Sequence, residues 1–198
     1  MLVQAMRIVL PCVLCFLAIA VACNALATAP PARPKARVVG CERASQGTFR
    51  EAIGSPGNQR IGPLLLMLAG TGSEGAARAS VGELRRLGWW KMPALVEPGH
   101  TVTLAIASSR SRVSGWTYGP EPRPRARVPA HLRSTDQAIT LRACGPRDVR
   151  HLSIVDGRRM TFWAGGIVFT DVPLCVPVEV WVDRETRPHR FTLSLAAG

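Results

Sequence analysis

The second half of the chain consists of short apolar runs with a two-residue period, separated by glycine- and proline-rich turns. In the run Thr101–Ile106 apolar and polar side chains alternate, as in a strand that buries one face. Glu97-Pro98-Gly99 is a turn signal before this run, and residues 183–188 are expected to form a hairpin loop. Seven runs of this kind occur, at residues 101–106, 112–118, 138–144, 160–163, 167–170, 176–182 and 190–195. The pattern predicts an all-β fold, an antiparallel immunoglobulin-like β-sandwich of about seven strands.

Length and composition are consistent with one such domain. The chain has 198 residues, of which 47% are hydrophobic, which is enough to bury a core of one domain but hardly of two. Gly165 and Gly166 interrupt the apolar stretch 162–169, and this position is expected to hold a bulge or a sharp bend.

The N-terminus has the layout of a secretory signal peptide. Arg7 is followed by the run 8–22, which contains no charged residue and is short for a membrane span. Ordinary cleavage would fall after Ala27, before Thr28, whereas the sequence before Cys23 resembles a bacterial lipoprotein signal in which Cys23 becomes the lipidated first residue. An uncleaved anchor is the third alternative. All three place the body outside the cytoplasm.

The leader is followed by a change in composition. Residues 28–40 begin with prolines and positive charges and are expected to form an extended spacer, which would suit a domain held off a membrane or wall. The predicted organisation is therefore a signal peptide at 1–27, a Pro-rich spacer at 28–40 and a β-sandwich domain at 41–198.

The net charge of +12 comes almost entirely from arginine. Lys35 and Lys91 are the two lysines among 25 basic residues, a skew that a GC-rich coding sequence also gives. Four basic residues precede Cys41, which leaves 21 basic against 13 acidic residues in the body. Such a charge favours anionic surfaces. Aromatic residues make up only 6%, without the interleaving of a single-strand nucleic-acid groove, so no nucleic-acid partner is expected.

The densest basic stretch in the body lies among prolines. It could dock on anionic lipid headgroups or a wall polymer, or it could be an exposed loop made rigid by its prolines. Its members are Arg123, Arg125, Arg127 and Arg133.

The body contains three cysteines, and export would put them where disulfides persist. Cys144 ends one predicted strand and Cys175 precedes another. We expect these two to pair, closing a loop of about 30 residues that would contribute about 3–4 kcal/mol. Cys41 would be left over, free or paired with another chain. No Cys-x-x-Cys occurs in the body and the four histidines show no ligand spacing, so no metal site is expected.

One segment imitates a dinucleotide-binding unit. Residues Gly70 to Gly75 fit Gly-x-Gly-x-x-Gly, after an apolar run at 64–69 and before a helix expected at 76–87. A second strand at 92–97 would end at Glu97, which could hold a ribose hydroxyl. No further β-α units follow, however, and Gly82 interrupts the helix. A strand followed by a flexible glycine-rich loop is the favoured interpretation, and no cofactor is expected.

The tryptophans allow two interpretations. They could form a sugar-stacking face, or they could pack in the core and at its edges, which large aromatics do well in a sandwich. They are Trp89, Trp90, Trp116, Trp163 and Trp181.

Residues 61–195 resemble a loosely defined group of uncharacterised exported bacterial proteins with an immunoglobulin-like β-sandwich. The shared features are the segments 95–104, 139–144, 162–168 and 175–180, and the closing Arg-Phe-Thr-Leu-Ser-Leu arm. The resemblance implies the fold and the export, but no activity and no catalytic residue.

The leading hypothesis is a non-enzymatic secreted or lipid-anchored cell-envelope domain with an interaction or structural role. Its expected partner is a protein or an envelope polymer, or an anionic membrane surface. The alternative is an extracytoplasmic carbohydrate-binding or hydrolytic protein that uses a tryptophan-lined face. A dinucleotide-binding oxidoreductase is the third hypothesis.

Overall fold

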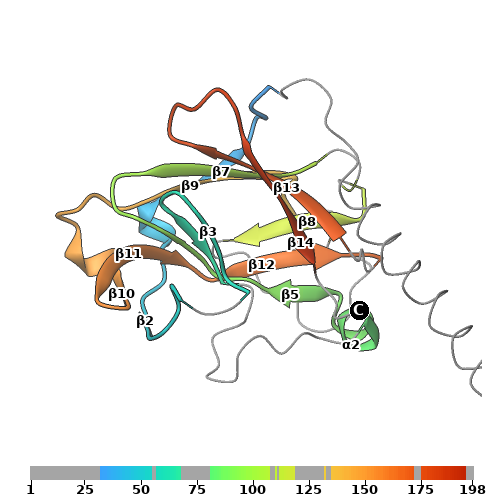
Figure 1. Cartoon of the computed structure of the whole chain (residues 1–198), viewed down its shortest axis with the longest axis horizontal. Helices are drawn as coiled ribbons and strands as arrows, with labels where there is room; N and C mark the ends of the chain where they lie inside the picture. The colour runs from blue at the N-terminus through green and yellow to red at the C-terminus, as the bar shows by residue number, and fades with distance from the viewer. Residues whose placement is uncertain are drawn as a thin grey trace, which may run out of the picture. The chain divides into compact units, whose positions relative to one another are not determined.

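The computed structural model describes residues 32–54, 57–67, 81–107, 110, 112–118, 132, 135–171 and 175–194. The chain divides into residues 1–30 and a body from Pro31 to Gly198, to which all the described residues belong. Within these ranges the body is mostly strand and has a single α-helix, α2 (Val81–Leu87), so the predicted all-β class is confirmed (Figure 1).

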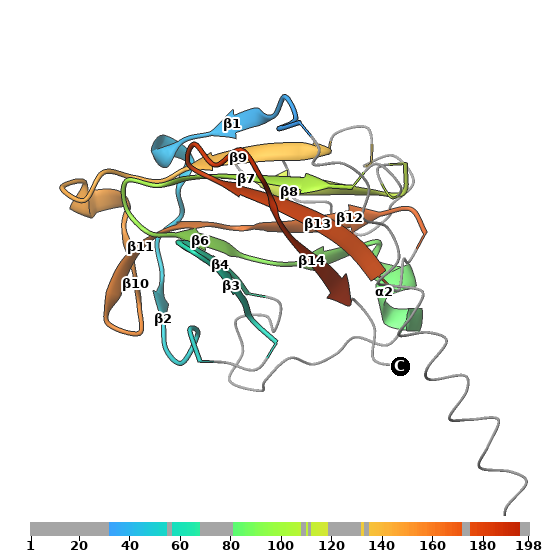
Figure 2. The ribbon, with the colours of Figure 1, turned by 45° about the horizontal axis from the view of Figure 1, so that its top comes forward.

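Three sheets contain the described strands (Figures 1 and 2). The five-stranded sheet has the order β1 (Arg37–Val39), β9 (Ala138–Arg142), β7 (Thr101–Ile106), β13 (Cys175–Val182), β14 (His189–Ser194). The six-stranded sheet has the order β2 (Thr48–Phe49), β10 (Ser153–Val155), β11 (Arg158–Trp163), β6 (Ala94–Val96), β4 (Leu64–Leu66), β3 (Gln59–Ile61). The three-stranded sheet has the order β5 (Trp89–Lys91), β12 (Gly165–Phe169), β8 (Ser114–Tyr118). Two 3₁₀ turns precede β2 and β10, namely η1 (Cys41–Arg43) and η4 (Val149–His151).

Each of the seven predicted runs is a strand, in chain order β7, β8, β9, β11, β12, β13 and β14. The hairpin loop expected at 183–188 joins β13 to β14, which pair antiparallel. Gly99 has a φ of +84°, a left-handed conformation that suits glycine at the predicted turn before β7. The remaining strands have at most three residues, too few to show a period in the sequence.

One face of each sheet contributes to the main core. In β7 and β13 alternate residues are buried there, which is the consequence of the two-residue period. Trp116, Tyr118 and Trp163 are the largest side chains of this cluster and are almost fully buried. A second cluster, around Leu65 and Leu95, lies on the other face of β4 and β6.

The expected bend lies between β11 and β12. β11 pairs with β6, whereas β12 pairs with β5 and β8, so the chain passes from one sheet to another within one residue. A side chain on Gly165 would collide with the ring of Tyr118, and one on Gly166 with the carbonyl oxygen of Trp90. The two glycines therefore permit the close approach of the neighbouring strands.

Two features of the N-terminal half differ from the sequence-based expectations. Residues 37–39, at the end of the segment expected to be spacer, form β1 and pair in parallel with β9. The two strands expected to flank the glycine-rich loop are β4 and β6, which pair antiparallel with Leu64 opposite Val96. A dinucleotide-binding unit needs these two strands to be parallel, so β4 and β6 do not form the strand pair of such a unit.

Candidate functional site

The candidate site is the end of the five-stranded sheet at which β9 and β13 end and β7 begins. The β7–β9 register places Thr101 opposite Arg142, so the residues just outside these strands lie side by side. The backbone N–H of Gly99 donates to the carbonyl of Cys144 at 2.8 Å, and that of Ala143 donates to the carbonyl of His100 at 2.9 Å. Two turns and the end of β9 are thereby held together.

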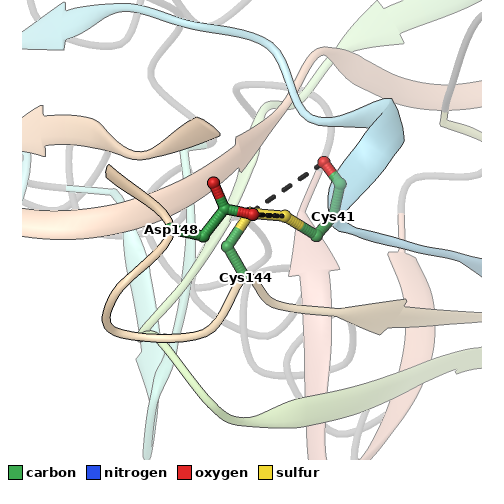
Figure 3. Close-up of side chains that lie close together, drawn as sticks. All are labelled: Cys41, Cys144 and Asp148. Atoms are coloured by element: carbon green, nitrogen blue, oxygen red, sulfur yellow. Dashed lines mark hydrogen bonds between the residues drawn. A yellow bond between two sulfur atoms is a disulfide. The ribbon is translucent and has the colours of Figure 1, made fainter. Parts of the chain in front are cut away.

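A disulfide between Cys41 and Cys144 fastens the N-terminal segment to this end of the sheet, with the two Cα atoms 4.7 Å apart (Figure 3). The parallel register pairs Val39 with Leu141. Continued by two residues, it brings Cys41 beside Ala143 and therefore next to Cys144. The parallel pairing of β1 is thus the structural reason for the bond.

The predicted Cys144–Cys175 pair is therefore wrong. β9 and β13 both pair antiparallel with β7, so they run in the same direction. Cys144 follows the end of β9, whereas Cys175 begins β13 at the opposite end of the sheet, and β13 alone spans about 23 Å at about 3.3 Å per residue. Cys41 is not the leftover cysteine, and Cys175 is itself disulfide-bonded.

A carboxylate lies against the disulfide. Oδ2 of Asp148 is 3.4 Å from Sγ of Cys41, and Figure 3 shows this carboxylate directed at the sulfur atoms. The three ligand-type atoms of Cys41, Cys144 and Asp148 lie within 4.8 Å of one another. Sulfurs joined to each other are not thiolate ligands, so this group is a disulfide beside a carboxylate and not a metal centre. The negative charge disfavours formation of a thiolate there and so opposes thiol–disulfide exchange.

A histidine–aspartate pair lies at the same end. Nδ1 of His100 is 2.8 Å from Oδ2 of Asp183, and the backbone N–H of Thr101 donates to Oδ1 of Asp183 at 2.9 Å. Partial burial raises the pKa of Asp183, but the Thr101 hydrogen bond, His100 and the Arg33 charge together outweigh it and leave this pKa below its ordinary value.

The pair has the geometry of a base and its orienting carboxylate, but not the surroundings of a catalytic site. The side chains are 41% and 43% exposed, and among the described residues no hydroxyl or thiol is hydrogen-bonded to the other ring nitrogen of His100. A similar exposed pair, His189 with Glu185 at 2.9 Å, lies in the adjacent β13–β14 loop. Both are exposed surface ion pairs.

The tryptophan-lined face is contradicted by burial. Trp116, Trp163 and Trp181 are 0% exposed, so none offers a ring to a sugar. Nε1 of Trp163 donates to the carbonyl of Gly40 at 3.2 Å, which ties this core residue to the segment before the disulfide. Trp89 and Trp90 are half-buried on β5. The core interpretation is correct for the three fully buried tryptophans.

Several predicted site residues lie outside the described residues. They are Cys23, the glycine-rich segment Gly70 to Gly75, and the four arginines Arg123, Arg125, Arg127 and Arg133.

The structure brings together a different set of basic residues, at the β10–β11 hairpin and the loop before it. Arg158 and Arg159 begin β11, and Arg147 and Arg150 lie in the preceding loop. The sequence carries a local signal for them in the adjacent Arg158-Arg159, but β10 has only three residues and was too short to indicate a hairpin there.

Comparison with protein-family models, with curated proteins and with solved structures finds no match. In the part of the chain that the structure describes, no helix has the length and apolar character needed to cross a membrane.

Proposed function

We propose that the chain is an exported, non-enzymatic domain of the cell envelope, secreted or lipid-anchored, whose role is interaction or structure. The observation that carries the proposal is the Cys41–Cys144 disulfide, which joins the first strand of the body to its main sheet. Disulfides of this structural kind are typical of extracytoplasmic proteins and rare in the cytosol of mesophiles. The leader-like sequence before the body supports the same location.

The proposed architecture is an immunoglobulin-like β-sandwich. Its support is that alternate residues of β7, β9 and β13 belong to the main core, which is shared by one face of each sheet. The pairing of the predicted strands among β7, β9, β13 and β14 is antiparallel, as such a sandwich requires.

The proposal of a non-enzymatic role rests on how the chemically versatile side chains are used. The hydroxyl of Tyr118 donates to the carbonyl of Met92 at 2.6 Å, and burial raises the pKa of Tyr118 far above its ordinary value. The phenol therefore stays protonated and serves the core. Asp148 lies against a disulfide, and Asp183 links two turns. These arrangements support a structural scaffold that functions through interactions at its surface.

Export is tested by expressing the full chain in a bacterium and fractionating the cells. We expect a processed protein outside the cytoplasm whose N-terminal mass corresponds to lipidated Cys23 or to free Thr28, and whose Cys41 and Cys144 resist a maleimide reagent until they are reduced. Cys23→Ser should release a lipidated protein from membranes but leave the maleimide pattern of Cys41 unchanged. Intact chain beginning at Met1 in the cytosol, with Cys41 reactive before reduction, would overturn the proposal.

A further inference from the structure

The β10–β11 hairpin and the loop before it present basic and apolar side chains together. We call this the hairpin surface; its residues are Arg147, Val149, Arg150, Ile154, Arg158 and Arg159. All six are exposed. In Figures 1 and 2 the hairpin and its preceding loop, both orange, project from the end of the body opposite helix α2.

Apolar exposure is concentrated on this surface. The large hydrophobic side chains that the described residues expose are Val38, Val149 and Ile154, and the last two lie only five positions apart, 57% and 41% exposed. Ile154 pairs with Arg159 across the β10–β11 ladder and with Thr48 of β2 on its other side. Directly paired side chains share a face of the sheet, so Ile154 lies between Arg159 and Thr48 on one exposed face of the hairpin. Arg158 pairs with the buried Val155 and projects from the other face, next to the turn of the hairpin.

The arginines of this surface are available to a partner. None of Arg147, Arg150, Arg158 and Arg159 forms an ion pair with another described residue. The same segment contains two acids, and both are directed to groups of the protein: Oδ2 of Asp156 accepts the backbone N–H of Ile53 at 2.7 Å, and Asp148 contacts the disulfide. The hairpin surface therefore presents more positive than negative charge.

The hairpin is held firmly by the segment that follows η1. The side-chain amide of Gln46 donates to the carbonyl of Arg150, and the backbone N–H of Ile154 donates to the carbonyl of Gly47 at 3.2 Å. Phe49 packs edge-on against Phe162, with ring centroids 4.8 Å apart. A surface supported in this way already has one arrangement before it binds, so binding costs little conformational entropy.

We propose that the hairpin surface docks the domain on an anionic phospholipid bilayer. The arginines would pair with headgroup phosphates, to which their guanidinium groups can donate two hydrogen bonds at once. Val149 and Ile154 would enter the boundary between headgroups and acyl chains. A soluble acidic polymer would use the arginines alone, because it offers no apolar medium to the two hydrophobic side chains. Their exposure among unpaired arginines is what favours a membrane.

The inference deepens the proposed function by naming the partner, and it rests on that function for a membrane to be within reach. The test uses the full exported chain with Cys23→Ser, so that no lipid anchor contributes to binding. Co-sedimentation is measured with phosphatidylcholine vesicles and with vesicles that also contain phosphatidylglycerol. We expect binding to the second kind only, falling as salt is raised.

Two double variants separate the contributions of charge and apolar surface. Arg158→Gln with Arg159→Gln should weaken binding to the anionic vesicles by about tenfold or more. Val149→Thr with Ile154→Thr keeps the β-branched shape and should weaken it by about threefold or more. The matched controls are Arg184→Gln with Arg187→Gln in the exposed β13–β14 loop, and Val38→Thr on β1; each should stay within about twofold of the parent. Retention of the disulfide and of the unfolding midpoint establishes that each variant is folded.

Three outcomes would overturn the inference. Equal binding to both kinds of vesicle would exclude a charge-directed surface. Equal losses of vesicle binding in the control and test arginine variants would show that binding depends only on the net charge of the protein. Full binding by the Val149→Thr, Ile154→Thr variant, with complete competition by polyglutamate, would assign the surface to an acidic polymer. Failure to bind vesicles would not count against the export proposal, because export is measured separately by fractionation. Conversely, a chain found in the cytosol would overturn the export proposal without changing the vesicle result.

Discussion

β1 and β2 both extend a sheet edge by parallel pairing, yet different interactions hold them. β1 is fastened by charge and by a covalent bond: Arg37 donates to Oδ2 of Asp136 at 2.6 Å, and the Cys41–Cys144 disulfide follows two residues after the strand. β2 is held by apolar packing, through Phe49 against Phe162.

The difference follows from what each strand can bury. β1 buries the single side chain Val39, and its outward Val38 is half exposed, so packing alone gives it little stability. β2 places Phe49 on a cluster that also contains Val155 and Met160. A short parallel edge strand with little apolar surface needs another fastening, and the disulfide supplies it.

The largest test of this comparison removes the covalent fastening. Cys41→Ser should lower the free energy of unfolding by about 3–5 kcal/mol, because the bond joins residues 103 positions apart and restricts the unfolded chain. Denaturant unfolding measures the loss, and amide exchange should show faster exchange in β1 than in β2.

Reduction of the parent protein is the control for this variant. In dithiothreitol the parent and Cys41→Ser should have the same stability, because the Cys41–Cys144 bond is then absent from both. A variant as stable as the oxidised parent, or one in which β2 loosens as much as β1, would show that the bond does not hold β1 specifically.

The strands long enough to show the two-residue alternation could be predicted from the sequence. The interactions that hold β1 and β2 in place could not. β7, β13 and β14 have six to eight residues, so their alternation was visible, and the loop between β13 and β14 was placed correctly. β1 and β2 have three and two residues, and their positions depend on partners 100 or more residues away. The predicted Cys144–Cys175 pair is wrong for this reason, because it is the β1–β9 register that brings Cys41 to Cys144. Trp116, Trp163 and Trp181 have no local signal that separates core from surface, and only the fold shows their burial.

The second test removes the apolar fastening of β2. Phe49→Ala should cost about 2 kcal/mol, because it deletes a half-buried ring and its edge-on contact with Phe162. Amide exchange should now accelerate in β2 and the adjoining β10, with β1 protected as before. Phe49→Leu, which retains most of the apolar volume, is the matched control and should lose less than half as much. Equal losses for the two variants would remove the ring contact as the cause.

A smaller effect is expected from the ion pair of β1. Arg37 also donates to the carbonyl of Tyr118 at 3.0 Å, so a double-mutant cycle is needed to isolate its coupling with Asp136. From Arg37→Gln, Asp136→Asn and the double variant we expect a coupling of about 0.5–1 kcal/mol, since the two side chains are 40% and 22% exposed. A coupling of zero would leave the disulfide as the main fastening of β1.

The smallest test concerns pH, which should distinguish the two strands because the segment leading into β1 is linked to Asp183 through Arg33. The guanidinium of Arg33 donates to the Asp183 carbonyl and, at 2.8 Å, to Oγ1 of Thr103. Folding lowers the pKa of Asp183 from its ordinary value of 3.8, so its ionised form favours the folded protein. This contribution is fully present above pH 3.8 and is lost as the pH falls through the lower folded value.

Asp183→Asn is the variant of choice because residue 183 has a φ of +46°, a left-handed conformation that asparagine adopts more readily than most residues. The variant should lose the part of the acid dependence due to this carboxyl, with a difference from the parent that is constant near neutral pH and shrinks below about pH 4. Amide exchange of β1 should respond to the substitution near neutral pH, and that of β2 should not. Glu51→Gln, an exposed carboxyl beside β2, is the matched control for the loss of one negative charge. If Asp183→Asn and Glu51→Gln shift the pH profile alike, general charge and not the links around Asp183 accounts for the acid sensitivity, and the contrast between the two strands reduces to the disulfide and the buried ring.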